Sequence, residues 1–422
     1  MSSSLGDVLR EDRWGLTAGH FQGFFSPSVI PCFERDFRLS SFNLSVPMPG
    51  FFWAVMHWRK NLGCDLERQR ALLRELHQLV DRPMRLMVVC GTQNRAILKH
   101  GLREKFPREL ELVAGPGCSV CVMPAGHIDA FVKIAMQPGV IMAACDDILK
   151  VPGSKDSLGS AMKKGARIRS INAPMDALDI ARREPEATVV YLAVGFEATA
   201  PGVAETILEA ASLGIENFCV LPSIRLLPPT IDLLMMDPGL NIRGVLCSDQ
   251  INTISDTEAY SELARRHNLS CYIAGFDIDD ILGGIVSLAR QIRNDESVFD
   301  DTSSFIYSSA DNRKARKMVS EVFFKVDTDW RGLGTIEKSG FVIRDELSLF
   351  DATKRFNVRF KEGEESCMCQ CNAIISGREL PPDCPAFGMV CTPQTPIGPC
   401  MISDEGLCHS YFKYGVQTSS RD

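Results

Sequence analysis

The stretch Arg85-Leu-Met-Val-Val-Cys90-Gly-Thr-Gln93 begins as an apolar run and ends in a turn that carries a cysteine. Similar short apolar runs recur along the chain, at Glu111–Ala114, Gly139–Ala143, Thr188–Val194, Phe218–Leu221, Arg243–Cys247 and Cys271–Ala274. Helical patterns such as Val203–Ser212 and Ile278–Arg293 lie between them. Apolar strands that alternate with amphipathic helices are typical of parallel sheets with both faces covered. The predicted fold class is therefore α/β.

The runs predict two Rossmann-like parallel-sheet domains, at residues 57–183 and 184–294, with a break near Arg182–Ala187. A helix is predicted at Asp65–Asp81, because its leucines share one face. Residues 295–422 form the third predicted domain, with a basic helix at Asn312–Phe324 followed by a segment rich in Gly, Pro and Cys. A small segment of that composition needs a metal or disulfides to hold it together.

Residues 1–56 differ from the rest of the chain, because they are rich in Phe, Ser and Pro and show no sustained periodicity. Met48 and Met56 offer later start sites. We interpret this segment as a disordered extension or an early gene start, and we expect it to be dispensable.

The composition and charge of the chain argue against nucleic-acid-binding, membrane and secreted proteins. The 422 residues include 46 basic and 53 acidic side chains, a net charge of −7, which gives no reason to expect a nucleic-acid partner. No apolar run approaches the roughly 20 residues that span a bilayer, and no secretory signal is visible at the N-terminus. The sequence predicts a cytoplasmic protein with no membrane segment.

The cysteines are numerous and unevenly distributed. In a large chain without an export signal, cysteines more often bind metal or do redox work than form a disulfide framework. Seven thiols near the C-terminus exceed the four that one metal site uses, so a four-cysteine iron–sulfur cluster would leave enough for a disulfide beside it. A structural zinc site is the alternative. The seven are Cys367, Cys369, Cys371, Cys384, Cys391, Cys400 and Cys408.

Three unusual segments follow predicted strands, and ligands in open parallel sheets bind at the carboxyl ends of strands. Cys90 ends the first, although a lone cysteine there is often a small buried apolar residue. Cys118 and Cys121 form a CxxC, whose spacing suits a dithiol/disulfide pair or half of a zinc knuckle. Glu197 opens a helix, where a carboxylate commonly interacts with the helix dipole.

Taken together, these motifs resemble those of the HypD family from about Met56 to Tyr414. Cys90-Gly-Thr92 resembles the family's CGTH, and Gly115–Cys121 resembles GPGCPVC with Ser119 in place of Pro. The remaining matches are Val151–Ser154 to VPGS, Gly195–Pro201 to GFETTAP, Trp330–Gly334, and the tail from Cys369 to Cys408.

The resemblance implies a scaffold that assembles the Fe(CN)2CO centre of [NiFe] hydrogenase with a HypC-like small chaperone and a HypE-like cyanide donor. It implies that Cys90 binds the iron being assembled, that Cys118 and Cys121 form the central redox pair, and that Glu197 and Glu405 belong to the site. It further implies a [4Fe–4S] cluster on Cys369, Cys384, Cys391 and Cys408, with Cys371 and Cys400 as a second thiol pair. Cys367 has no assigned counterpart.

Two residues depart from the family pattern. Gln93 stands where CGTH has histidine, and Gln250 replaces the histidine of a second motif, GHVS. Glutamine can hydrogen-bond but cannot shuttle protons as histidine does. The first hypothesis is a HypD-type assembly protein. The second is a divergent paralogue that keeps the cluster and thiols without assembling iron, and the third is a zinc-stabilised α/β enzyme.

Overall fold

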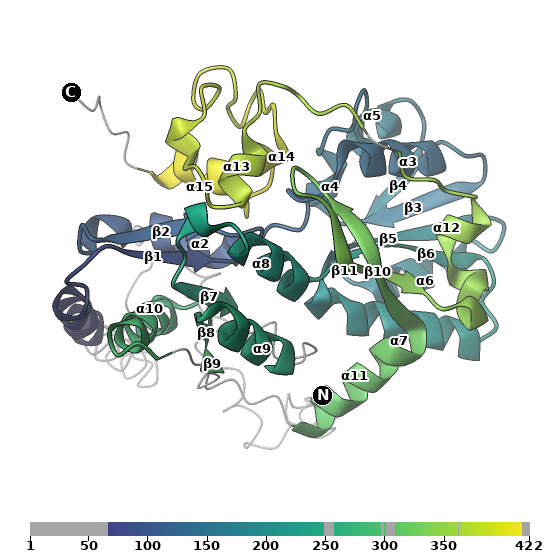
Figure 1. Ribbon diagram of the computed structural model, residues 1–422. Coiled ribbons are helices and arrows are strands. Elements are labelled where there is room, and N and C mark those ends of the chain that lie inside the picture. Colours follow the sequence, from purple (N-terminus) through teal and green to yellow (C-terminus); the bar gives the residue numbers. More distant parts are fainter. Residues whose placement is uncertain (1–65, 249–256, 297–298, 301–308, 362, 416–422) are drawn as a thin grey trace, which may run out of the picture. The chain divides into compact units, whose positions relative to one another are not determined.

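The chain divides into two units, Met1–Gly63 and Cys64–Asp422. The computed structural model describes residues 66–248, 257–296, 299–300, 309–361 and 363–415, all within the second unit (Figure 1). The predicted extension at residues 1–56 and Gln250 lie outside the described residues.

The first sheet is parallel at every described pairing. Its order is β2-β1-β7-β8-β9, formed by β2 (Leu110–Ala114), β1 (Met84–Val88), β7 (Gly244–Ser248), β8 (Ser270–Ala274) and β9 (Phe299–Asp300). A helix at residues 66–79 and α10 (Ile278–Arg293) pack on one face, where side chains such as Leu86 and Val88 are fully buried. The alternate residues Met87 and Val89 face a second core.

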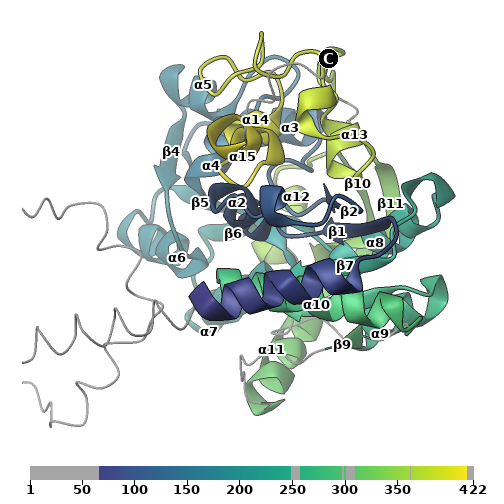
Figure 2. The same ribbon diagram turned by 90° about the vertical axis from the view of Figure 1, so that its left-hand side faces the viewer.

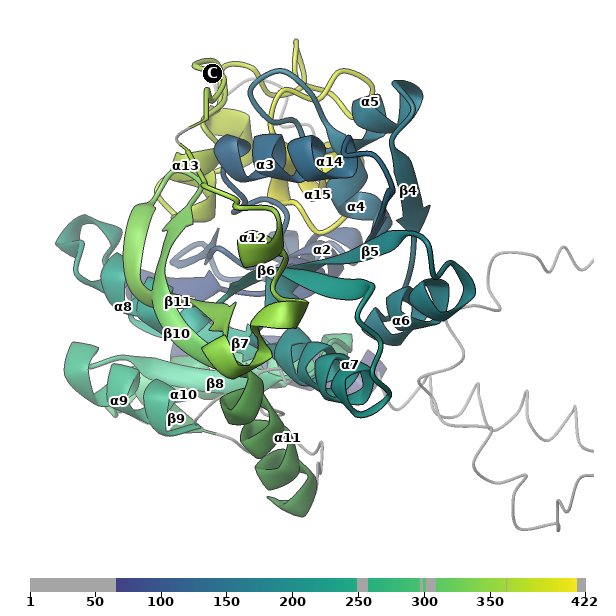
Figure 3. The ribbon, with the colours of Figure 1, turned by 90° about the vertical axis from the view of Figure 1, so that its right-hand side faces the viewer.

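The second sheet is mixed. Its order is β10-β11-β6-β5-β3-β4, formed by β10 (Phe323–Trp330), β11 (Gly334–Ile343), β6 (Phe218–Arg225), β5 (Thr188–Phe196), β3 (Val140–Ala144) and β4 (Arg167–Ser170). The four strands β4, β3, β5 and β6 are parallel, whereas the β10–β11 hairpin joins β6 antiparallel. Helices α6 (Pro174–Arg183), α7 (Ala200–Ser212) and α11 (Ser309–Val322) cover one face, as Figure 3 shows for α7 and α11.

Each predicted apolar run forms a strand, and the predicted α/β class is confirmed. Alternation explains this, because Ile141 and Val189 enter one core while Met142 and Val190 enter the other. Burying such an aliphatic side chain on either face contributes about 1.5–3 kcal/mol. A strand with both faces buried therefore reads as a continuous apolar run.

The sheets do not follow the predicted domain division at residues 183 and 184. Strand β3 pairs with β5 across that boundary, and β1 pairs with β7. The hairpin β10–β11, predicted within a separate third domain, belongs to the second sheet. The order of strands and helices predicts parallel pairing but does not specify which strand becomes the neighbour.

The Cys-rich segment packs over the start of α2 (Gly91–Lys99). Its short helices are α13 (Cys371–Ile375), α14 (Pro399–Ile402) and α15 (Leu407–Tyr414), and α15 contacts α2 (Figure 2). Gly91 permits this approach, because a Cβ there would lie 2.5 Å from the carbonyl oxygen of Glu405. The segment is thereby held at the carboxyl end of β1.

Candidate functional site

Cys90 lies at the carboxyl end of β1 and directly precedes α2. Strands β1 and β7 pair with Val88 opposite Leu246, so Cys90 and Ser248 follow at the same level along the two strands. Both residues line a cavity of about 60 Å³, together with Glu197 and Glu405. The chain thus brings the predicted cysteine and both predicted carboxylates to one crevice.

Burial raises the pKa of the Cys90 thiol above its ordinary value, and the nearby Glu405 carboxylate adds to this effect. The backbone N–H groups of Gln93 and Thr92 and the Ser248 hydroxyl act in the opposite direction on that pKa, because they stabilise a thiolate. Ser248 was not predicted from the sequence. Its position directly after an apolar run, like that of Cys90, is the signal that could have identified it.

The Cys118–Cys121 pair forms a disulfide in the loop that follows β2. Gly117 lets this loop cross the end of β1, because a Cβ there would lie 1.3 Å from the carbonyl oxygen of Val89. Cys118 and Cys400 line the same small cavity, of about 20 Å³, and Glu405 lines it as well. The predicted redox pair therefore lies between Cys90 and the Cys-rich segment.

The Cys-rich segment gathers its thiols around one further cavity. The Sγ atoms of Cys371 and Cys400 lie 3.0 Å apart, which is a contact between two thiols rather than a disulfide. Gly398 closes over Cys369, since a Cβ there would lie 2.3 Å from its Sγ. The cysteines that line the cavity are Cys369, Cys371, Cys384, Cys391, Cys400 and Cys408.

The donor set of this cavity fits an iron–sulfur cluster, because all four predicted ligands face it from an apolar wall that includes Ile374 and Phe387. The space between them is small, about 20 Å³. In the described part of the chain, no three His, Cys, Asp or Glu side chains form a group arranged to hold a single metal ion. Cys367 is exposed and does not line the cavity.

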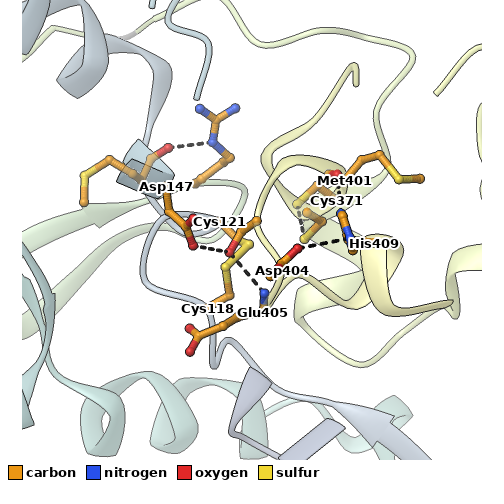
Figure 4. The surroundings of a disulfide bond; sticks show 12 residues. Cys118, Cys121, Asp147, Cys371, Met401, Asp404, Glu405 and His409 are labelled. Carbon is orange, nitrogen blue, oxygen red and sulfur yellow. Dashed lines mark hydrogen bonds and ion pairs between the residues drawn. A yellow bond between two sulfur atoms is a disulfide. The ribbon is translucent and has the colours of Figure 1, made fainter. Parts of the chain in front are cut away.

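Glu405 connects the Cys-rich segment to the crevice. The Thr92 hydroxyl donates a hydrogen bond to its carboxylate at 3.0 Å, and burial raises the pKa of that carboxyl group. Its backbone N–H donates to the Ser403 hydroxyl, which in turn donates to Asp147 at 3.0 Å. Figure 4 shows Asp147, Glu405 and Cys371 around the disulfide. Asp147 was not predicted, although it too follows an apolar run.

Glu197 interacts with a helix other than the one it opens. Its carboxylate, 4% exposed, accepts hydrogen bonds from the backbone N–H of Leu227, the first residue of α8 (Leu227–Met235), at 3.2 and 3.3 Å. Tyr260 donates to it at 3.4 Å. The carboxylate thus interacts with the start of α8, which lies 30 residues later in the chain, whereas the sequence predicts an interaction with the helix that Glu197 opens.

Gln93 directs its amide away from the Cys90 crevice, toward the ends of β7 and β8. Its side chain is fully buried and does not line the crevice. Nε2 donates to the carbonyl oxygens of Ala274 at 2.9 Å, Gly275 at 3.0 Å and Cys247 at 3.2 Å. Oε1 has no hydrogen-bond partner among the described residues. The amide thus ties α2 to the ends of β7 and β8, and only the backbone of Gln93 faces Cys90.

Replacing Gln93 with leucine is expected to destabilise the protein by about 1–3 kcal/mol, because three buried carbonyls lose their donor. The midpoint of urea unfolding measures this effect. Gln137→Leu is the matched control, since the Gln137 amide is exposed and donates to the carbonyl oxygen of Lys133, near the end of the preceding helix. Equal midpoints for the two variants would contradict a structural role for the Gln93 amide.

None of the helices described here has the length and apolar character needed to cross a membrane.

Comparisons with known proteins agree with the arrangement of these motifs. The family model HypD, described as "Hydrogenase formation hypA family", matches residues 67–415. Hydrogenase maturation factor HypD of Azotobacter vinelandii is 35% identical over 343 residues, which cover 80% of this chain and 90% of that protein. The Escherichia coli (strain K12) protein of the same name is 35% identical over 355 residues, covering 84% and 95%. The chain therefore belongs to the HypD family.

Proposed function

We propose that this chain acts in hydrogenase maturation as a scaffold and thiol-redox protein that assembles an Fe(CN)2CO centre. The observation that carries the proposal is a series of three cavities that share walls. Cys400 lines both the Cys-rich cavity and the cavity beside Cys118. Gly117 and Glu405 line both that cavity and the Cys90 crevice. Cysteine side chains therefore line successive cavities from the Cys-rich segment to the Cys90 crevice.

In this proposal Cys369, Cys384, Cys391 and Cys408 hold one [4Fe–4S] cluster. When bound, such a cluster supplies single electrons to neighbouring sulfur groups. The apolar lining and the four thiol donors of the Cys-rich cavity support this assignment. The thiol contact between Cys371 and Cys400 supports their assignment as the adjacent pair.

The thiol relay begins from the state in which Cys118–Cys121 is a disulfide and Cys371 and Cys400 are thiols. The Cys400 thiolate attacks Cys118, a Cys118–Cys400 bond forms, and Cys121 leaves as a thiolate. The Cys371 thiolate then attacks Cys400, a Cys371–Cys400 disulfide forms, and Cys118 leaves as a thiolate. Two electrons have passed to the Cys118–Cys121 pair, which becomes a dithiol.

That dithiol can release cyanide from a thiocyanate carried by a HypE-like donor. Two thiol hydrogens are consumed, because R–S–CN becomes R–SH and HCN while the Cys118–Cys121 disulfide re-forms. Iron held by Cys90, shared with a HypC-like chaperone, takes up the cyanide as cargo. The crevice that joins Cys90 to Glu197 and Glu405 supports this step. We assign the activity to the cytoplasm, where free thiols persist.

The family membership supports assembly of iron rather than the divergent paralogue without that activity, and the inward-facing Gln93 amide removes one reason for the second hypothesis. The test is anaerobic co-purification of the chain with a HypC-like chaperone, followed by infrared spectroscopy. Bands of iron-bound cyanide and carbon monoxide are expected with the unaltered chain and are expected to be absent with Cys90→Ala. Their persistence in Cys90→Ala would contradict iron binding through Cys90.

A further inference from the structure

Arg331 lies at the tip of the β10–β11 hairpin and contacts three separate segments. Its backbone N–H donates to Val122 at 2.8 Å, and Nε donates to the carbonyl oxygen of Met123 at 2.6 Å. Nη2 donates to the carbonyl oxygen of Pro152 at 3.3 Å, and Nη1 forms an ion pair with Glu365. Arg331 is 7% exposed, so these groups hold a largely buried guanidinium.

The segments that Arg331 joins carry both thiol pairs. Val122 and Met123 directly follow Cys121, and Glu365 opens the Cys-rich segment. The other carboxylate oxygen of Glu365 accepts a hydrogen bond from the backbone N–H of Ala125, at the start of α3 (Ala125–Ala135), at 3.0 Å. A single side-chain pair therefore ties the disulfide loop to the segment that contains Cys371 and Cys400.

The residue after Arg331 packs against the helix that carries Cys371. Gly332 has φ +71°, and a Cβ there would lie 2.2 Å from the Cβ of Asn372, which follows Cys371 in α13. The hairpin tip thus contacts the loop of one pair through Arg331 and the helix of the other through Gly332. The sequence motif Trp330–Gly334 was matched to the family, but no role was predicted for it.

We propose that Arg331 is a positioning residue that sets the spacing between Cys118 and Cys400. The inference rests on the thiol relay proposed above. Cys118 and Cys400 line one cavity, and Arg331 would hold constant the distance between them across it. An arginine suits this role because its planar guanidinium can donate to several segments at once while it pairs with a carboxylate. A displacement of about 1 Å between reacting groups can slow a reaction about a hundredfold.

The test measures formation of a Cys118–Cys400 bond in the full chain. Cys121→Ser and Cys371→Ser together leave one thiol on each side of the cavity. Diamide supplies the oxidation, because its azo group takes up the two thiol hydrogens and becomes a hydrazine as the S–S bond forms. Samples are quenched by alkylation at intervals, and mass spectrometry of the linked peptides gives the rate.

Adding Arg331→Gln to this background is expected to slow the cross-link about ten- to a hundredfold. Arg331→Lys keeps the charge beside Glu365 but lacks the planar guanidinium, and it is expected to give an intermediate rate. It replaces the glutamine variant in the test if that variant does not fold. Arg355→Gln is the matched control. Arg355 also donates to two segments, through the carbonyl oxygen of Glu216 and the hydroxyl of Thr188. Neither segment carries a cysteine of the two thiol pairs.

The outcomes distinguish the positioning role of Arg331 from the thiol relay itself. A cross-link in the background that slows only when Arg331 is changed supports its positioning role. The same rate in the background, Arg331→Lys and Arg331→Gln overturns that role while leaving the relay intact, as does equal slowing by Arg355→Gln. Absence of any Cys118–Cys400 bond in a folded background contradicts the relay itself.

Discussion

Replacing Cys384 or Cys391 with serine is expected to reduce the iron content from about four atoms per chain to the background level. Both thiols are buried and line the Cys-rich cavity. A serine hydroxyl is a poor substitute for the thiolate that an iron–sulfur cluster uses. The measurement is iron and acid-labile sulfide in anaerobically purified protein, together with its brown colour.

Cys367→Ser is the matched control for these variants. Cys367 belongs to the same segment and is exposed, but it does not line the cavity. Its replacement is expected to leave iron, sulfide and colour unchanged. Stoichiometric zinc without iron in the unaltered protein would instead favour a structural zinc site and contradict the cluster assignment.

Replacing Cys118 with serine is expected to abolish hydrogenase maturation while leaving the cluster in place. Cys118 shares a cavity with Cys400, whereas Cys121 is fully buried, so Cys118 is the sulfur that the Cys-rich segment can reach. A serine there can neither form the mixed disulfide nor accept electrons. The measurement is hydrogenase activity in a strain that lacks HypD and expresses the variant.

The control for Cys118 is Cys145→Ser. Cys145 is a free, exposed cysteine that follows β3, and it lines neither the Cys90 crevice nor the cavity beside Cys118. Its replacement is expected to retain full activity. Activity from Cys118→Ser equal to that of Cys145→Ser would mean that electrons reach the crevice by another route.

The strand ends were the most informative part of the sequence. Cys90 and Cys118 follow apolar runs, and parallel strands place their carboxyl ends at one edge, so their convergence could be predicted. Strand β4 could not be recognised in this way, because only Ile168 of its four residues is buried. The mixed second sheet was likewise missed, because in β10 only the two end residues, Phe323 and Trp330, are buried, so the strand shows no continuous apolar run.

The direction of individual side chains also could not be predicted from the sequence. Position 93 is two residues beyond the start of a helix, and its sequence neighbours do not indicate whether the amide faces the crevice or the sheet. The carbonyl oxygens of Ala274 and Gly275, far along the chain, determine that direction. For the same reason Arg331 could be noticed as part of a motif, but its contacts with Met123 and Glu365 required the folded chain.

Complementation by the unaltered chain is the most direct test of its proposed role in assembling the hydrogenase iron centre. The full sequence, Gln93 and Gln250 included, is expressed in a strain that lacks HypD, and hydrogenase activity is measured against the strain's own HypD. Restored activity is expected, because the crevice, both thiol pairs and the proposed cluster ligands are all present. Background activity from folded protein that carries about four irons per chain would contradict a role in assembling the hydrogenase iron centre.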